Sequence, residues 1–342
     1  MMKKLSLNKL YAFFEAVSAK EKLYLPVDNA AGQAQFMPWQ SGVKMSHALN
    51  TTRSAKDFFF PQTEALMEFK LEGKTIQIID NRKEEEDFVI FGARACDVRS
   101  FSILDKVFLA EPVDTFYANR RKHGVIVSVA CTRPTETCFC GAFGIDMTAP
   151  EGDVAAWMTE SDVYFKAQSE KGEALLASVA ELLDDADEAA VEAQKADVKA
   201  IAEKLPLKNL PLGAIASGEM LDFFNSPKWA SLSESCLGCG TCTFVCPTCQ
   251  CYDIKDFNTG HGIIRQRCWD SCMYSDFTKM SAGQPRPTQL ERFRQRFMHK
   301  LVYFPSNNNG EFGCVGCGRC LAKCPISMNI VKVMKALGGE TK

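Results

Sequence analysis

The chain of 342 residues is long enough for two domains, and its 46% of hydrophobic residues is ordinary for a protein with a buried core. Its 40 Lys and Arg residues nearly balance its 42 Asp and Glu residues, and the net charge of −2 argues against a nucleic-acid-binding protein. No apolar run reaches the roughly 18 residues that a membrane-spanning helix needs, so we expect no membrane span.

The chain begins with a basic, amphipathic stretch, residues 1–17. Its apolar part is interrupted by Asn8, Lys9 and Glu15, and no small-residue cleavage site follows, so we interpret it as a first helix rather than a signal peptide. The spacing predicts that the apolar face of this helix consists of Leu7, Leu10, Tyr11, Phe14 and Val17.

Residues 1–228 are predicted to form an α/β domain. A helix is expected at 102–110, and residues 172–205 are expected to form one or two helices with a solvated acidic face. The run GVIVSVA at 124–130 is almost continuously apolar, which is typical of a strand buried on both faces. Strands are expected at 75–80, 87–93, 124–130 and 162–167.

Residues 229–342 are predicted to form a second, largely α-helical domain that carries one cysteine motif twice. CLGCGTCTFVCP spans 236–247 and CVGCGRCLAKCP spans 314–325, and both have the spacing Cys-x-x-Cys-x-x-Cys-x-x-x-Cys-Pro. The segment between them, 248–313, is far longer than the link in a small ferredoxin, so we expect it to be structured. The predicted fold class is therefore α+β, with an α/β domain followed by a domain like the bacterial two-cluster ferredoxins.

The distribution of the cysteines indicates a cellular compartment. Of the 16 cysteines, twelve follow residue 230, and many are separated by only two residues. A secreted disulfide scaffold would be short and would spread its cysteines along the chain to join its loops. We therefore expect a cytoplasmic protein whose thiolates serve as metal ligands.

Each motif can supply three thiolates to one [4Fe–4S] cluster, because each step of three residues returns the side chain towards the same centre. Glycines within the motifs permit so tight a turn. In bacterial two-cluster ferredoxins, the fourth cysteine of each run ligates the other cluster. Two zinc sites are the alternative, but zinc needs only two Cys-x-x-Cys pairs. The expected ligands are Cys236, Cys239, Cys242 and Cys324 for one cluster, and Cys314, Cys317, Cys320 and Cys246 for the other.

Four cysteines of the first domain could hold a third [4Fe–4S] cluster. Cys96 and Cys131 each follow a predicted strand, and the carboxyl ends of parallel strands form one edge of a sheet, where ligand sites gather. Cys138 and Cys140 lie in the loop that follows Cys131. The alternatives are a zinc site or free thiols, with Cys96 a buried small apolar residue.

The remaining four cysteines lie between the two motifs. Cys249 and Cys251 follow the first motif directly, and Cys268 and Cys272 lie further along. They could form a further metal site, ligate an additional cluster, or be reduced thiols packed around the first cluster. The basic stretch 286–300 could be a solvated helix face or a docking surface for an acidic partner.

Catalytic motifs are missing from the sequence. The four histidines form no spacing motif, and no glycine-rich phosphate-binding loop of the GxGxxG or Walker type is present. We therefore expect no catalytic residue and no site for a nicotinamide or a nucleoside triphosphate.

Several segments together resemble one family of iron–sulfur subunits. They are FGARACDVRSFSILDKVF, CTRPTETCFCGAFG, CLGCGTCTFVCPTCQCYDI, RQRCWDSC, HKLVYF and CVGCGRCLAKCP. In this order they are similar to the iron–sulfur subunit of anaerobic sulfite reductase and equally to the β subunit of cytoplasmic NiFe hydrogenase, or sulfur reductase. The likeness spans roughly residues 50–330.

This resemblance implies an electron-transfer subunit without a catalytic centre of its own. Such subunits lie between a flavoprotein that oxidises NAD(P)H and a terminal oxidoreductase, in a multi-subunit complex of anaerobic metabolism. The resemblance also implies a role beyond packing for Cys96, Cys131, Cys138 and Cys140, and for Cys249, Cys251 and Cys272. Cys268 is not expected among the ligands.

Two other functions remain open at this point. In the first, Cys249, Cys251, Cys268 and Cys272 would build a cluster with an open site, and the chain would reduce a small substrate by itself. In the second, the clusters would only hold the fold together.

Overall fold

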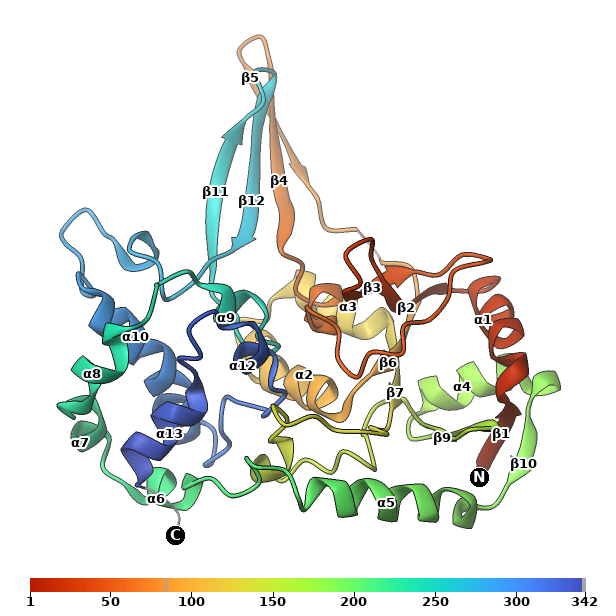
Figure 1. Cartoon of the computed structure of the whole chain (residues 1–342). Helices are drawn as coiled ribbons and strands as arrows, with labels where there is room; N and C mark the ends of the chain where they lie inside the picture. The colour runs from red at the N-terminus through yellow and green to blue at the C-terminus, as the bar shows by residue number, and fades with distance from the viewer. Residues whose placement is uncertain (84, 340–342) are drawn as a thin grey trace.

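The computed structural model describes residues 1–83 and 85–339. Within them, a mixed sheet of eight strands forms the centre of the N-terminal part (Figure 1). Its middle strands β2, β6, β7 and β8 run parallel, and the strands towards both edges are antiparallel. In order across the sheet, the strands are β10 (Asp184–Ala186), β1 (Met2–Ser6), β9 (Asp162–Ala167), β8 (Val154–Met158), β7 (Gly124–Val129), β6 (Phe88–Ala93), β2 (Lys22–Asp28) and β3 (Ala34–Pro38).

Helices cover both faces of this sheet. Helices α1 (Leu10–Ser18) and α4 (Glu170–Ser178) share one apolar core with alternate residues of β6 and β7, and α2 (Ala95–Phe108) and α3 (Thr115–His123) share a second core with the others. All residues of β6 and β7 are buried. This confirms the prediction that the strand at 124–130 is buried on both faces.

Two predicted segments differ in detail. The chain starts with strand β1, and the first helix then buries Phe13, which stacks on Phe165, while Tyr11 of the predicted apolar face is 44% exposed. In the region 172–205, α4 and α5 (Glu192–Ala202) are separated by β10, which pairs with β1. The acidic residues here are compatible with an edge strand, since Lys3 of β1 forms an ion pair with Asp185.

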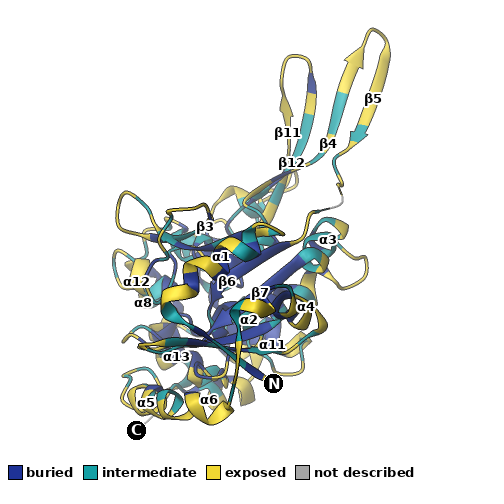
Figure 2. Cartoon of the chain, turned by 90° about the vertical axis from the view of Figure 1, so that its right-hand side faces the viewer, coloured by how far each residue is buried: buried dark blue, intermediate teal, exposed yellow. Residues whose placement is uncertain are grey.

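A second sheet projects from the body as an arm (Figures 1 and 2). Its strands are β11 (Tyr252–Asn258), β12 (Gly262–Trp269), β4 (Thr63–Glu72) and β5 (Thr75–Asp80), in that order. The predicted strand at 75–80 therefore exists, but it lies in the arm rather than in the central sheet. The segment between the cysteine motifs contributes the hairpin of β11 and β12, which crosses the expected domain boundary to pair with β4.

One face of the arm carries large apolar side chains in solvent. Leu71 lies opposite Ile76, and Phe69 lies opposite both Ile78 and Ile263, so these side chains share a face. Leu71, Ile76 and Ile78 are each at least 60% exposed. Figure 2 shows β5 largely exposed along its length.

Buried polar contacts attach the arm to the body. The guanidinium of Arg267 on β12 is 4% exposed and forms ion pairs with Glu64 and Asp114. The indole of Trp269 donates a hydrogen bond of 3.1 Å to the carbonyl of Phe60. These contacts fix the end of β12 just before Cys272.

The C-terminal part is mostly helical. Trp229, Phe293, Phe297 and Met334 form its apolar core. Helix α10 continues into a π-helical turn at His299–Tyr303 and then into α11 (Phe304–Asn307). The helices around this core include α6 (Leu212–Ser217), α7 (Met220–Phe224), α8 (Lys228–Glu234), α10 (Gln289–Met298) and α13 (Ile330–Gly338). None of the helices in the described residues is both long and apolar enough to cross a membrane.

Candidate iron–sulfur centre

The two cysteine motifs have the same backbone conformation. Gly238 and Gly316 have φ of 66° and 60°, and Gly240 and Gly318 have φ of 71° and 76°. These left-handed conformations are available to glycine at little cost. In each motif the second of these glycines caps a short helix, α9 (Thr241–Phe244) in one and α12 (Arg319–Lys323) in the other, and these helices pack together.

The first triplet is held by contacts to its backbone. The carbonyl of Cys236 accepts a hydrogen bond from the amide of Gln289, and that of Cys239 accepts one of 3.3 Å from the hydroxyl of Tyr274. Cys239 is exposed, and its hydrogen bond with Thr241 lowers the pKa of its thiol. Burial raises the pKa of Cys242, with Cys236 and Cys239 among the neighbours that act in the same direction. The thiols of Cys236 and Cys239 therefore lie near that of Cys242.

The second triplet is more deeply buried and has Cys246 beside it. Burial raises the pKa of the Cys314 thiol to about 12 and also raises the pKa values of Cys317 and Cys320. Cys246 contributes to the rise in all three and also to that of Cys242, so it lies near both triplets although it belongs to the first motif. The sulfur of Cys324 lies 3.3 Å from the carbonyl of Met328, so its assignment to the first triplet rests on the sequence rule alone.

The four N-terminal cysteines gather at the carboxyl ends of β6 and β7. Cys96 lies in the first turn of α2, which follows β6, and Cys131 follows β7. Burial raises the pKa of Cys140 to about 12, and Cys131 and Cys138 add to this rise. Cys96 lies near both Cys140 and Cys317. The neighbouring parallel strands explain this gathering, since their carboxyl ends lie at the same edge.

The N-terminal group touches the second motif directly. The amide of Phe139, between Cys138 and Cys140, donates a hydrogen bond of 2.9 Å to the carbonyl of Gly316. A Cβ atom at Gly316 would lie 2.5 Å from the carbonyl carbon of Phe139. The loop and the motif are thus packed backbone against backbone.

A further group forms next to Cys246. Cys249 is its neighbour and lowers the pKa of the Cys246 thiol. The neighbouring Cys272 lowers the pKa of Cys251 to about 7, and Cys251 is in turn a neighbour of Cys249. Cys268 lies within β12 opposite Asp253.

Four buried cations accompany these thiols, and the sequence analysis did not identify them as part of the site. Arg296 and Lys300 are 3% and 5% exposed, so neither a solvated face nor a docking surface describes the whole basic stretch 286–300. Lys56 lies two residues before the aromatic run 58–60, and this run could have indicated from the sequence that Lys56 is buried. Arg319 lies between two cysteines of the second motif.

The donor set consists of cysteine thiols, which are the ligands of iron–sulfur clusters and also of structural zinc ions. All 16 cysteines are free, so no disulfide competes for the thiols. Within residues 1–83 and 85–339, no three or more His, Cys, Asp or Glu side chains converge on a point that could hold one ion. A cubane distributes its four thiolates over four irons and so needs a wider arrangement than a zinc ion does.

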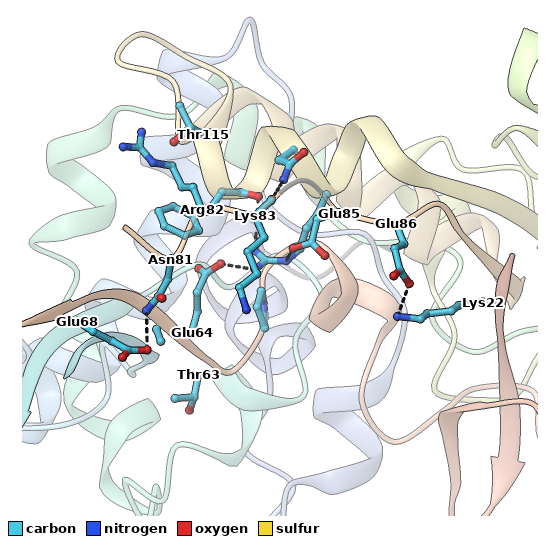
Figure 3. A pocket seen from close by; sticks show the side chains of 15 residues that line it. Lys22, Thr63, Glu64, Glu68, Asn81, Arg82, Lys83, Glu85, Glu86 and Thr115 are labelled. Atoms are coloured by element: carbon cyan, nitrogen blue, oxygen red, sulfur yellow. Dashed lines mark hydrogen bonds and ion pairs between the residues drawn. The ribbon is translucent and has the colours of Figure 1, made fainter. Parts of the chain in front are cut away.

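A charged hollow of about 730 Å³ lies elsewhere, between the base of the arm and α3. Figure 3 shows that its side chains pair with one another, with Lys22 bound to Glu86 and Asn81 to Glu68. No cysteine lines it. It is therefore separate from the thiol groups.

Comparison with known proteins is consistent with this chemistry. Residues 235–328 match the family model of the 4Fe-4S dicluster domain. The sulfhydrogenase 2 subunit beta of Pyrococcus furiosus is 34% identical over 286 residues, which cover 82% of this chain and 81% of that protein. No solved structure gives a significant match.

Proposed function

Because this chain belongs to the β-subunit family of hydrogenases and sulfur reductases, we propose that it relays electrons between a flavin subunit that oxidises NAD(P)H and a terminal oxidoreductase. The chain is an iron–sulfur electron-transfer subunit of a hydrogenase or sulfhydrogenase complex. The identity of the two neighbouring subunits is the part that we propose, together with their assembly in the cytoplasm.

The observation that carries this proposal is the contiguity of the thiol groups. The two motifs pack through α9 and α12, and the second motif contacts the loop that carries Cys138 and Cys140. These contacts support electron transfer between neighbouring sites within this one chain. We assign the first cluster to Cys236, Cys239, Cys242 and Cys324, the second to Cys314, Cys317, Cys320 and Cys246, and a third to Cys96, Cys131, Cys138 and Cys140.

Each cluster, when bound, supplies one-electron chemistry. The protein positions the thiolates, covers most of them from water and surrounds them with apolar side chains. Backbone amides near the sulfurs add weak hydrogen bonds, such as that of 3.5 Å from Gly238 to the sulfur of Cys236. Cluster potentials depend on such hydrogen bonds, on solvent exposure and on net charge.

A second candidate function rests on the group beside Cys246. Cys251 is a neighbour of both Cys249 and Cys272, which supports this candidate, whereas Cys268 lies in the arm opposite Asp253. A cluster with an open position there could act directly on a small substrate. Turnover of sulfite, protons or a disulfide by the purified chain with an artificial donor would favour this function over a relay.

Anaerobic co-purification tests the relay. We expect an affinity-tagged chain to retain a flavoprotein and a terminal oxidoreductase, and its clusters to be reduced by NADH or NADPH only when the flavoprotein is present. A complex without a flavoprotein, or reduction of the isolated chain by the nicotinamide, would refute the proposed position in the electron path.

A further inference from the structure

Lys300 is a buried cation that forms no ion pair with a carboxylate of residues 1–83 and 85–339. Its ammonium group donates hydrogen bonds to the hydroxyl of Thr248, at 2.6 Å, and to the carbonyl of Gly313, at 3.1 Å. Both acceptors are neutral. An ammonium group has three N–H donors, so one N–H remains after these two hydrogen bonds.

The surroundings of Lys300 are thiols. Thr248 stands between Cys246 and Cys249, and Gly313 directly precedes Cys314. The hydrogen bonds to Thr248 and Gly313 therefore place the ammonium group at the segments that carry Cys246, Cys249 and Cys314.

The backbone holds Lys300 in this place. It lies in the π-helical turn His299–Tyr303. Such turns are rare in proteins, and many of those known lie at functional sites. The carbonyl of Lys300 accepts a hydrogen bond of 2.9 Å from the amide of Gly313. A Cβ at Gly313 would lie 3.2 Å from the Cα of Lys300, so this close approach favours glycine. The lysine is therefore attached to the second motif at both its backbone and its side chain.

Two further buried cations extend this positive region. Arg296 lies one helical turn before Lys300 and has Cys242 and Cys320 as neighbours, and its Nε has no hydrogen-bond partner in the described structure. Lys56 donates a hydrogen bond of 2.8 Å to the carbonyl of Cys249 and lies 3.7 Å from the centre of the Trp269 ring. Three elements of the chain thus bring positive charge to the thiols.

The physical cost of this arrangement indicates its role. An isolated buried charge is strongly unfavourable unless an opposite charge compensates it. Thiolates and the cluster that they hold are negative, and the reduced state carries one more negative charge than the oxidised state. A fixed cation in a poorly solvated interior therefore favours the reduced state.

We propose that Lys300 sets the reduction potential of the cluster at Cys246 and the 314–320 triplet, and holds it above the value that the same ligands would give without the cation. This inference rests on the ligand assignment proposed above. With its potential raised in this way, the cluster accepts an electron more readily than the same cluster would without Lys300. Lys300 acts as a positioning charge and takes no part in ligation.

The test is a redox titration of the full chain, followed by electron paramagnetic resonance. In Lys300→Gln, which removes the charge but keeps an N–H donor, we expect one cluster signal to shift to lower potential. Lys300→Met should shift the same signal in the same direction, and Lys300→Arg should stay close to the wild type. Lys279→Met, at an exposed lysine, is the matched control and should leave all potentials unchanged.

Iron content and the cluster signals together distinguish a failure of the proposed function from a failure of the role proposed for Lys300. A wild-type chain without a reversible cluster signal would refute the proposed function itself. Neutral variants that keep their iron and show unchanged potentials would refute the role of Lys300 alone. If both neutral variants lose iron while Lys300→Arg keeps it, Lys300 serves to retain the cluster rather than to set its potential, and the proposal is wrong.

Discussion

Arg319 and Asp97 form a buried bidentate ion pair that joins two cysteine-bearing elements far apart in the sequence. Arg319 Nη1 lies 2.6 Å from Asp97 Oδ1, and Nη2 lies 3.0 Å from Oδ2. Asp97 directly follows Cys96 on α2, and Arg319 lies between Cys317 and Cys320. The pair therefore sets the distance between the N-terminal thiol group and the second motif.

Replacing Asp97 by asparagine should destabilise the protein strongly. The change leaves the guanidinium of Arg319 buried without a carboxylate, and breaking such a pair costs about 3–5 kcal/mol of unfolding free energy. Denaturant titration under anaerobic conditions measures this loss. Asp256→Asn is the matched control, because its ion pair with Arg265 is exposed and solvent-screened, so its loss should change the unfolding free energy far less. Equal losses in the two variants would contradict the role assigned to the buried pair.

Gly316→Ala should damage the contact between the second motif and the Cys138–Cys140 loop. The new methyl group would lie 2.5 Å from the backbone of Phe139, and φ at this position is 60°. Gly310→Ala has a similar φ of 81° but meets nothing within 4 Å, so it isolates the clash from the backbone strain. We expect Gly316→Ala to lower iron content and thermal stability much more than Gly310→Ala. Equal effects would mean that the close approach is unimportant.

Cys246→Ser should remove the cluster of the 314–320 triplet rather than that of its own motif. Cys246 lies near Cys314, Cys317 and Cys320, and in the proposed reciprocal ligation it is their fourth ligand, so its loss should leave that cluster incomplete. Cys324→Ser should in turn damage the cluster of the 236–242 triplet. Paramagnetic resonance of the reduced variants distinguishes the two signals. Loss of the same signal in both variants would contradict reciprocal ligation.

Iron analysis tests the third cluster. Three cubanes predict about twelve irons per chain, and Cys131→Ser should lower this to about eight. Cys268→Ser is the control, because Cys268 lies within β12 and is not among the proposed ligands. A wild-type value near eight that Cys131→Ser leaves unchanged would show that the N-terminal thiols hold no cluster.

The sequence was informative wherever function depends on local spacing. The triplets, the glycines of positive φ within them, and the buried strand at 124–130 were all predicted from patterns of fewer than about fifteen residues. The placement of Cys96 and Cys131 at neighbouring strand ends was also predicted, because parallel order follows from general rules for α/β sheets. The arm was not predicted, since β4 and β12 are far apart in the chain and pair only through tertiary structure.

By itself, the sequence determined that this chain offers two repeated sets of thiolates for iron–sulfur clusters, because the geometry of each set is contained within a single turn. Only the tertiary structure decided which other groups are neighbours: Phe139 against Gly316, and Lys300 against the segments that carry Cys246, Cys249 and Cys314. These relationships arise from packing between distant segments. Burial then turns ordinary surface residue types, such as lysine and arginine, into charges that the cysteine sites must balance.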